Sequence, residues 1–196
     1  MLSLLSFALS MTKEQLYAYG EREIDAPTME AIDGFMEERK AGKPIAYIVG
    51  TKEFYSDLFC VNASVLIPRP ETEELVDEAL ASVPRKVDVR SVLDMGTGSG
   101  VIGILLAKHL PSATIDCVDC SRKALETARR NASFHGVAGR TRFLCADLFG
   151  ALKETQKYDL IVANLPYVPL KEWNLLERDV KEFEPPGALK GGDDGL

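Results

Sequence analysis

The sequence predicts an α/β protein with a doubly wound, mostly parallel sheet of Rossmann-like architecture. Three observations favour this class. From Ser91 onward, short apolar stretches alternate with segments of helical periodicity, which is the pattern of repeated βαβ units. A glycine-rich turn, "GTGSG", separates the first apolar stretch from the first of these helices. Polar residues follow each apolar stretch, at the strand ends where such sheets bind ligands.

The chain before this alternation is expected to contain two smaller segments. Residues 1–42 predict a helical appendage, in which Pro27 lies in the first turn of the second helix and Gly42 ends it. The apolar residues expected on its buried face are Leu4, Leu5, Ala8, Leu16, Tyr17, Tyr19, Met29, Ile32, Phe35 and Met36. Residues 43–68 are rich in β-branched and aromatic residues and predict a β-hairpin that links the two parts.

Residues 69–196 are expected to form the sheet domain. Pro70 and the glutamates that follow it open a first helix in the way that the helix dipole favours. The expected strands are "SVLDMG", "TIDCVD", "TRFLC" and "YDLIVA". Two helices connect the first three strands. One spans residues 101–110, and the other is capped by Ser121 and runs to Gly136.

Charge and cysteine content bear on the compartment and the partners. A net charge of −7 argues against a protein that holds nucleic acid by neutralising phosphates, so such contact is expected to be indirect at most. No run approaches the roughly 20 apolar residues of a membrane-spanning helix, and no membrane partner is expected. The cysteines lack the partners of a metal site and are expected to be buried thiols, typical of a reducing cytoplasm. They are Cys60, Cys117, Cys120 and Cys145.

The glycine-rich turn has two interpretations. Gly98, Gly100 and Gly103 match the dinucleotide fingerprint, with Asp119 at the distance where a ribose hydroxyl would meet it. A tighter pattern, D-x-G-x-G-x-G, begins at Asp94 on the strand itself. That aspartate opposes a pyrophosphate but suits the amino group and the sulfonium of S-adenosylmethionine, so a methyl donor is favoured over a nicotinamide cofactor. The residues expected to bind the donor are Asp94, Gly96, Thr97, Gly98, Ser99 and Gly100.

Residues 164–167, Asn-Leu-Pro-Tyr, follow the fourth strand and predict a clamp for an NH2 group. The side-chain carbonyl of Asn164 and a neighbouring backbone carbonyl can each accept one N–H. Together they would orient a planar nitrogen and help to draw its lone pair out of conjugation. Pro166 stiffens the backbone, and the ring of Tyr167 can pack against the planar acceptor. The acceptor is then an amide or an exocyclic amine.

Five segments carry a family resemblance: "GKPIAYIVGTKEF", "LIPRPETEELV", "VLDMGTGSGVIGILLA", "DCSRKALETARRNA" and "GGDDGL". They resemble the HemK-type protein-(glutamine-N5) methyltransferases, and "IPRPETE" is the most discriminating. The resemblance implies a class I S-adenosylmethionine-dependent enzyme that methylates the glutamine of the Gly-Gly-Gln motif in peptide-chain release factors. It implies that Asp119 binds the ribose of the donor and that Asp147 and Leu148 lie beside the adenine. The residues that it assigns to the target glutamine are Asn164, Leu165, Pro166 and Tyr167.

Two positions depart from the family pattern. Leu165 stands where the family usually has proline, and Asn-Leu-Pro-Tyr also resembles the motif of RNA adenine-N6 methyltransferases. Leu148 stands where many relatives have an aromatic ring. The family also extends beyond both ends of this sequence, so a fragment without its last strands, or an edge strand covered by another chain, is expected. An RNA adenine-N6 methyltransferase, a donor-binding domain without turnover and a nicotinamide-dependent oxidoreductase remain alternatives.

Overall fold

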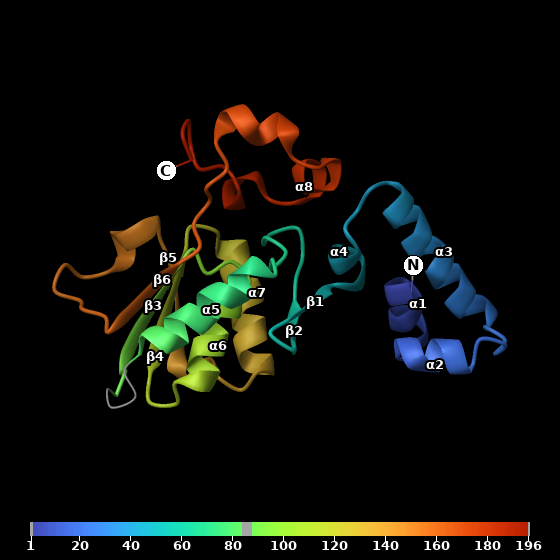
Figure 1. Ribbon diagram of the computed structural model, residues 1–196, viewed down its shortest axis with the longest axis horizontal. Coiled ribbons are helices and arrows are strands. Elements are labelled where there is room, and N and C mark those ends of the chain that lie inside the picture. Colours follow the sequence, from blue (N-terminus) through green and yellow to red (C-terminus); the bar gives the residue numbers. More distant parts are fainter. Residues whose placement is uncertain (1, 84–87, 196) are drawn as a thin grey trace.

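A four-stranded parallel sheet forms the centre of the molecule. The computed structural model describes residues 2–83 and 88–195. The strands are β3 (Ser91–Met95), β4 (Thr114–Asp119), β5 (Thr141–Cys145) and β6 (Leu160–Ala163). Their order is β5-β4-β3-β6, and every pairing is parallel (Figure 1). The predicted α/β class and the four predicted strands are therefore confirmed.

Three long helices pack against this sheet. They are α5 (Glu71–Ser82), α6 (Val101–His109) and α7 (Arg122–Phe134). The hydroxyl of Ser121 caps α7 by accepting the Ala124 N–H at 3.2 Å, as the sequence predicts. Helix α6 is apolar nearly all round because it lies between the sheet and its neighbours, and seven of its residues are buried. These helices enclose the main core of the domain.

The register of the strands brings their carboxyl ends to one level. Met95 at the end of β3 is opposite Val118 of β4 on one side and Ala163 of β6 on the other. The residues that follow these strands therefore meet at one edge of the sheet. In Figure 1 the C-terminal segment around α8 (Arg178–Phe183) lies above this edge.

The N-terminal helices form a group that stands apart from the sheet (Figure 1). They are α1 (Leu2–Leu9), α2 (Lys13–Ala18) and α3 (Ala26–Lys40), and capping by Thr12 and Asp25 fixes where the second and third begin. The predicted helix over 27–40 is confirmed. The predicted buried face is wrong in part, since Tyr17, Tyr19 and Met29 are exposed. The group is too small to cover them.

The segment after these helices differs from the predicted hairpin at its start. Residues Ile45–Val49 form the short helix α4, and only then does the hairpin of β1 (Thr51–Phe54) and β2 (Asp57–Cys60) begin. Gly50, with a φ of +73°, ends α4 and allows the change from helix to strand. The β-branched and aromatic residues of α4 serve here as packing surface, since Tyr47 is buried beside Val65.

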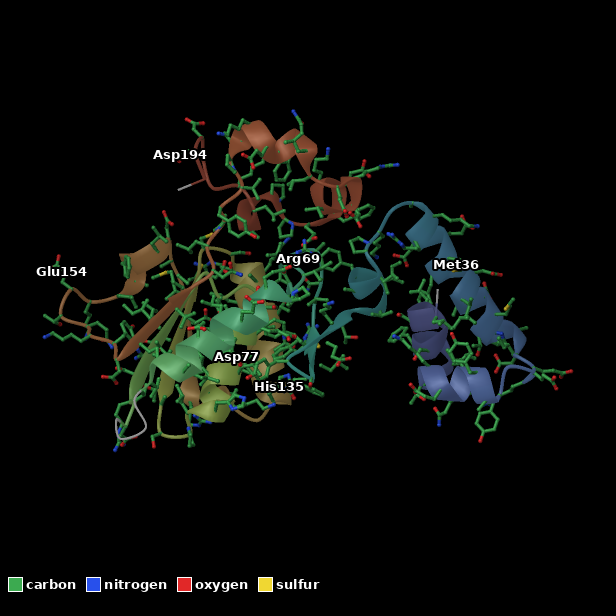
Figure 2. All side chains as sticks on the ribbon, in the orientation of Figure 1. Met36, Arg69, Asp77, His135, Glu154 and Asp194 are labelled. Carbon is green, nitrogen blue, oxygen red and sulfur yellow. The ribbon has the colours of Figure 1, made fainter. Side chains whose placement is uncertain are left out.

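Five shorter elements complete the chain. The 3-10 turns η1 (Ala138–Arg140) and η2 (Leu148–Ala151) flank β5, and η3 (Leu170–Leu175), α8 and η4 (Pro186–Ala188) follow β6. Glu184, buried just after α8, accepts the N–H of Ile67 at 3.1 Å and pairs with Arg69, which Figure 2 labels beneath the C-terminal segment. This ion pair ties the C-terminal segment to the loop that precedes α5.

The four cysteines differ in their exposure. Cys117 is buried, but Cys120 and Cys145 are exposed, so the expectation of four buried thiols is wrong. The reason is positional, because these two cysteines lie at strand ends, where the sheet opens to solvent. Among the described residues, no helix combines the length and the hydropathy that a membrane-spanning segment requires.

Candidate active site

The glycine-rich turn and Asn164 lie side by side at the carboxyl ends of β3 and β6. The two strands are paired in register up to Met95 and Ala163, so Gly96 and Asn164 are the next residues on neighbouring strands. Gly96 has a φ of +72°, and a β-carbon there would lie 2.9 Å from Leu165 Cδ2 and 3.7 Å from the Asn164 backbone oxygen. The positive φ favours glycine at this position, where the turn passes close to Asn164 and Leu165.

Asp94 lies beneath the turn and supports it from inside. Its side chain is fully buried, and Oδ2 accepts the Thr97 hydroxyl at 2.6 Å and the Gly103 N–H at 2.9 Å. Burial raises the pKa of Asp94 to about 6, although both hydrogen bonds oppose the rise. Its other oxygen, Oδ1, is buried and finds no hydrogen-bond partner among the described residues. Gly103 therefore belongs to the packing of the turn, because a β-carbon there would lie 2.9 Å from Asp94 Oδ2.

The backbone N–H groups of the turn are largely used within the protein. Gly96 and Thr97 both donate to the Val118 carbonyl, at 2.9 and 3.0 Å, and Gly100 donates to the Thr97 carbonyl. Gly98 donates to Asp119 Oδ2 at 2.9 Å. A pyrophosphate site needs such N–H groups pointing at the ligand. The turn is therefore poorly suited to a dinucleotide.

A cavity of about 440 Å³ opens at this edge of the sheet. Its lining includes these residues predicted to bind donor or acceptor: Gly96, Thr97, Gly98, Ser99, Asp119, Asp147, Leu148, Asn164, Leu165 and Pro166. Three predicted residues do not line it. Asp94 is beneath the turn, Gly100 packs against Ala128 and Ile104, and the Tyr167 side chain is 68% exposed.

The charge of the cavity suits a cationic ligand. Asp119 and Asp147 are its charged lining residues, and the described lining contains no lysine, arginine or histidine. Asp119 holds the N–H groups of Gly98 and Ser121 with its two oxygens, at 2.9 and 2.8 Å, which fixes its carboxylate toward the cavity floor. Each oxygen keeps a lone pair for a hydroxyl group. The donor set therefore fits S-adenosylmethionine, which is cationic at sulfur and carries no phosphate.

Asn164 is held by a residue that the sequence did not single out. Its Nδ2 donates to Thr72 Oγ1 at 3.4 Å, and Thr72 is buried in the first turn of α5. No hydrogen bond to Asn164 Oδ1 is found among the described residues, so this oxygen stays available to a ligand in the cavity. The sequence signal that could identify Thr72 is its position within the "IPRPETE" segment.

The far wall of the cavity was also missed. It comes from the loop before α5 and from the segment after α8, namely Ser64, Val65, Leu66, Pro68, Pro185, Gly187 and Ala188. These residues are far from the sheet in sequence and carry little reactive chemistry. The ion pair of Arg69 and Glu184 joins the two segments. A pattern of motifs at strand ends cannot predict such a wall.

Comparisons with known proteins identify relatives of this chain. A family model described as "Methyltransferase small domain" matches residues 74–189, and one described as "PrmC N-terminal domain" matches residues 2–50. In solved structures the likeness is partial. The ribosomal protein L11 methylase from Lactobacillus delbrueckii subsp. bulgaricus is 28% identical with a TM-score of 0.43, over 50% of this chain and 47% of that one.

Curated relatives match nearly the whole chain. A release factor glutamine methyltransferase from Koribacter versatilis is 41% identical over 98% of this chain and 68% of its own length. One from Chlorobaculum tepidum is 42% identical over 95% of this chain and 66% of its own length. The chain thus spans about two thirds of the length of these relatives. It belongs to the release factor glutamine methyltransferase family, whose members are S-adenosylmethionine-dependent enzymes.

Proposed function

We propose that this chain transfers a methyl group from S-adenosylmethionine to the side-chain amide nitrogen of the glutamine in the Gly-Gly-Gln motif of release factors. The observation that carries the proposal is the position of Asn164, beside the glycine-rich turn and with its amide nitrogen engaged by Thr72. This arrangement leaves the amide oxygen for an N–H of the acceptor. A side-chain amide offers two such N–H groups on a planar nitrogen.

Some residues of the site would hold the donor, and others would hold the acceptor. When bound, the donor supplies an activated methyl group on a positively charged sulfur. The sulfur keeps the electron pair of the bond that breaks. Asp119 would accept the ribose hydroxyls, Asp147 and Leu148 would border the adenine, and residues 96–99 would approach the donor with backbone atoms. Asp94 would act from beneath, by keeping the turn in its shape.

The clamp would act on the acceptor nitrogen. Asn164 Oδ1 and the backbone carbonyl of Leu165 would each accept one N–H, which orients the lone pair toward the methyl group and lowers its conjugation. After transfer the nitrogen is strongly acidic and loses a proton to water, so the described residues need not supply a base. Tyr167, exposed next to the clamp, is available to contact the substrate protein.

A transfer assay with labelled donor tests this function. The purified chain is incubated with a release factor and with a variant of that factor whose Gly-Gly-Gln glutamine is replaced. We expect label in the first and none in the second, and a strong reduction with Asn164→Ala. Label in RNA would instead support adenine-N6 methylation, which the resemblance of Asn-Leu-Pro-Tyr to that motif suggests. Donor binding without transfer to either would support a binding domain.

Partners and compartment follow from the same proposal. Release factors act in translation, so we place the protein in the cytoplasm, with a protein substrate and at most indirect contact with nucleic acid. The acidic balance of the chain, with a net charge of −7, supports this choice, because binding to phosphates would favour a basic surface.

A further inference from the structure

Residues 189–192, near the end of the chain, run directly along the residues that follow the clamp. Val168 donates its N–H to the Leu189 carbonyl at 2.9 Å and accepts the Gly191 N–H at 3.0 Å. Leu170 donates to the Gly192 carbonyl at 2.9 Å, and Val168 forms a parallel bridge with Lys190. Backbone hydrogen bonds therefore join the two segments.

Gly191 occupies a place that no other residue fits. A β-carbon at this position would lie 2.8 Å from the Pro166 carbonyl oxygen, 2.8 Å from Tyr167 Cα and 3.0 Å from Gly195 Cα. Real β-carbons do not approach other atoms so closely, and these are backbone atoms that cannot rotate away. Glycine is therefore required here by close approach.

Gly195 makes a second contact of the same kind. Its φ is +88°, and a β-carbon there would lie 2.6 Å from the Tyr167 carbonyl oxygen and 3.1 Å from Pro169 Cγ. Two glycines thus rest against the two peptide groups that come directly after Pro166 and Tyr167. Both contacts involve the stretch whose start is the proposed clamp.

We propose that Gly191 and Gly195 are positioning residues that set where the Asn164–Tyr167 clamp holds the acceptor. The ring of Pro166 fixes its φ, so Pro166 ψ is the one free rotation between the Leu165 carbonyl and the peptide group after Pro166, and the contact of the Pro166 carbonyl oxygen with Gly191 restricts that rotation. Fixing the Pro166 carbonyl against Gly191 therefore fixes the Leu165 carbonyl, one of the two groups proposed to accept an acceptor N–H. This inference rests on the proposed function.

The contacts of Gly191 and Gly195, which together we call the glycine brace, also bear on the leucine at position 165. A proline at this position would restrict the backbone between Asn164 and Pro166 by its ring. Leu165 has no ring, and its side chain instead contacts Gly96 of the turn. The glycine contacts restrain the same stretch from its other end. A clamp without its first proline can thereby keep a defined geometry.

Kinetics of the Gly191→Ala variant test the proposal. The chain is assayed with a release factor for kcat and for KM, and its affinity for S-adenosylmethionine is measured by calorimetry. We expect kcat to fall by tenfold or more, since a misplacement of about 1 Å can cost roughly 100-fold in rate. Donor affinity should stay within about twofold, because the three atoms nearest to a β-carbon at Gly191 belong to Pro166, Tyr167 and Gly195, and not to residues 96–99 or Asp119. Gly195→Ala should likewise lower kcat and leave donor affinity within about twofold.

The matched control is Gly139→Ala, where a β-carbon has nothing within 4 Å. It should leave kcat, KM and donor affinity unchanged. If the parent chain methylates the release factor and both brace variants keep their kcat, the proposal is overturned while the proposed function stands. Unfolding of both variants, measured by circular dichroism, would also overturn it, because the glycines would then serve the stability of the whole domain. A parent chain without transfer would contradict the proposed function itself.

Discussion

At the scale of single residues, the orientation of the Asn164 amide is the feature on which the proposed chemistry depends. An amide presents a carbonyl on one side and an NH2 group on the other, and only the carbonyl can accept an N–H from the substrate. Thr72 Oγ1 takes a hydrogen bond from the NH2 group at 3.4 Å. Thr72 also lies in the first turn of α5, where the helix gives its side chain a fixed position.

Replacing Thr72 by valine should lower the rate of methyl transfer without changing the affinity for the donor. Thr72→Val keeps the shape of the side chain and removes the oxygen that accepts from Asn164. We expect the methyl-transfer rate to fall about fivefold, the effect of one hydrogen bond of roughly 1 kcal/mol, with donor affinity unchanged. Thr72→Ser restores the hydroxyl and should restore most of the rate. Equal rates for the valine and threonine forms would show that Asn164 needs no such partner.

Asp94 should make the stability of the domain depend on pH. Its pKa in the folded chain is raised to about 6 from the usual 3.8, so the folded state holds this proton more tightly than the unfolded state. The contribution is present below the unfolded pKa and is lost as the pH rises through about 6. A rise of about two pKa units corresponds to roughly 3 kcal/mol.

The Asp94→Asn variant removes this titration. Between about pH 4 and pH 7, the free energy of unfolding of the variant should gain roughly 3 kcal/mol relative to that of the parent, as measured by urea denaturation at both values. A difference between the two proteins that does not change with pH would mean that Asp94 titrates normally.

The residues of the site divide into those that local pattern reveals and those that it does not. The turn glycines, Asp119 and Asn164 stand at strand ends in recognisable motifs, so the sequence predicts them. The bond between Thr72 and Asn164 joins residues 92 positions apart. No local pattern encodes such a pairing. The sequence also does not predict that Asp94 is buried beneath the turn. The position of a carboxylate on a strand does not indicate which face of the sheet its side chain occupies.

At the scale of elements, the sheet and its helices follow their sequence signals closely, while the connecting segments do not. Caps, prolines and periodicity mark α3, α5, α6 and α7, and the structure has these helices where they are predicted. The sequence predicts a strand where the structure has helix α4, because Ile45–Val49 is rich in residues that favour strands. Its packing against Val65 outweighs that local preference.

The buried ion pair of Glu184 and Arg69 should stabilise the junction between two elements. The Glu184 side chain is 1% exposed and also accepts the Ile67 N–H. Glu184→Ala would leave a buried N–H without an acceptor and a guanidinium without its partner. We expect a loss of about 3 kcal/mol in the free energy of unfolding, measured by urea denaturation.

A surface pair provides the matched control for Glu184. Glu182 pairs with Arg178 on α8, and both side chains are well exposed. Glu182→Ala should therefore change the free energy of unfolding by less than about 1 kcal/mol. Similar losses for the two alanine variants would contradict a special role for the buried pair.

At the scale of the whole molecule, strand β6 is an open edge of the sheet. Among the described residues it pairs only with β3, and its Ile161 side chain is 54% exposed. An exposed apolar edge strand can pair with another chain. The fold class could be predicted from the sequence, but the exposure of this edge depends on which strands stand beside it.

Self-association through β6 is therefore expected. Light scattering at increasing concentration should show masses above the 21.5 kDa of the single chain, and Ile161→Lys should return the mass to that value. Phe134→Lys is the control, since Phe134 is 70% exposed on α7, away from the edge. Association that responds to Phe134→Lys and not to Ile161→Lys would contradict the role of the edge.

The central claim, that Asn164 grips the target amide beside the donor turn, is tested most directly by one structure. The chain would be crystallised with S-adenosylhomocysteine and a peptide that contains Gly-Gly-Gln. The predicted result is a glutamine side chain in the cavity, with its nitrogen about 2.9 Å from Asn164 Oδ1 and facing the sulfur. A glutamine bound outside the cavity, or an Asn164 side chain turned away from it, would contradict the claim.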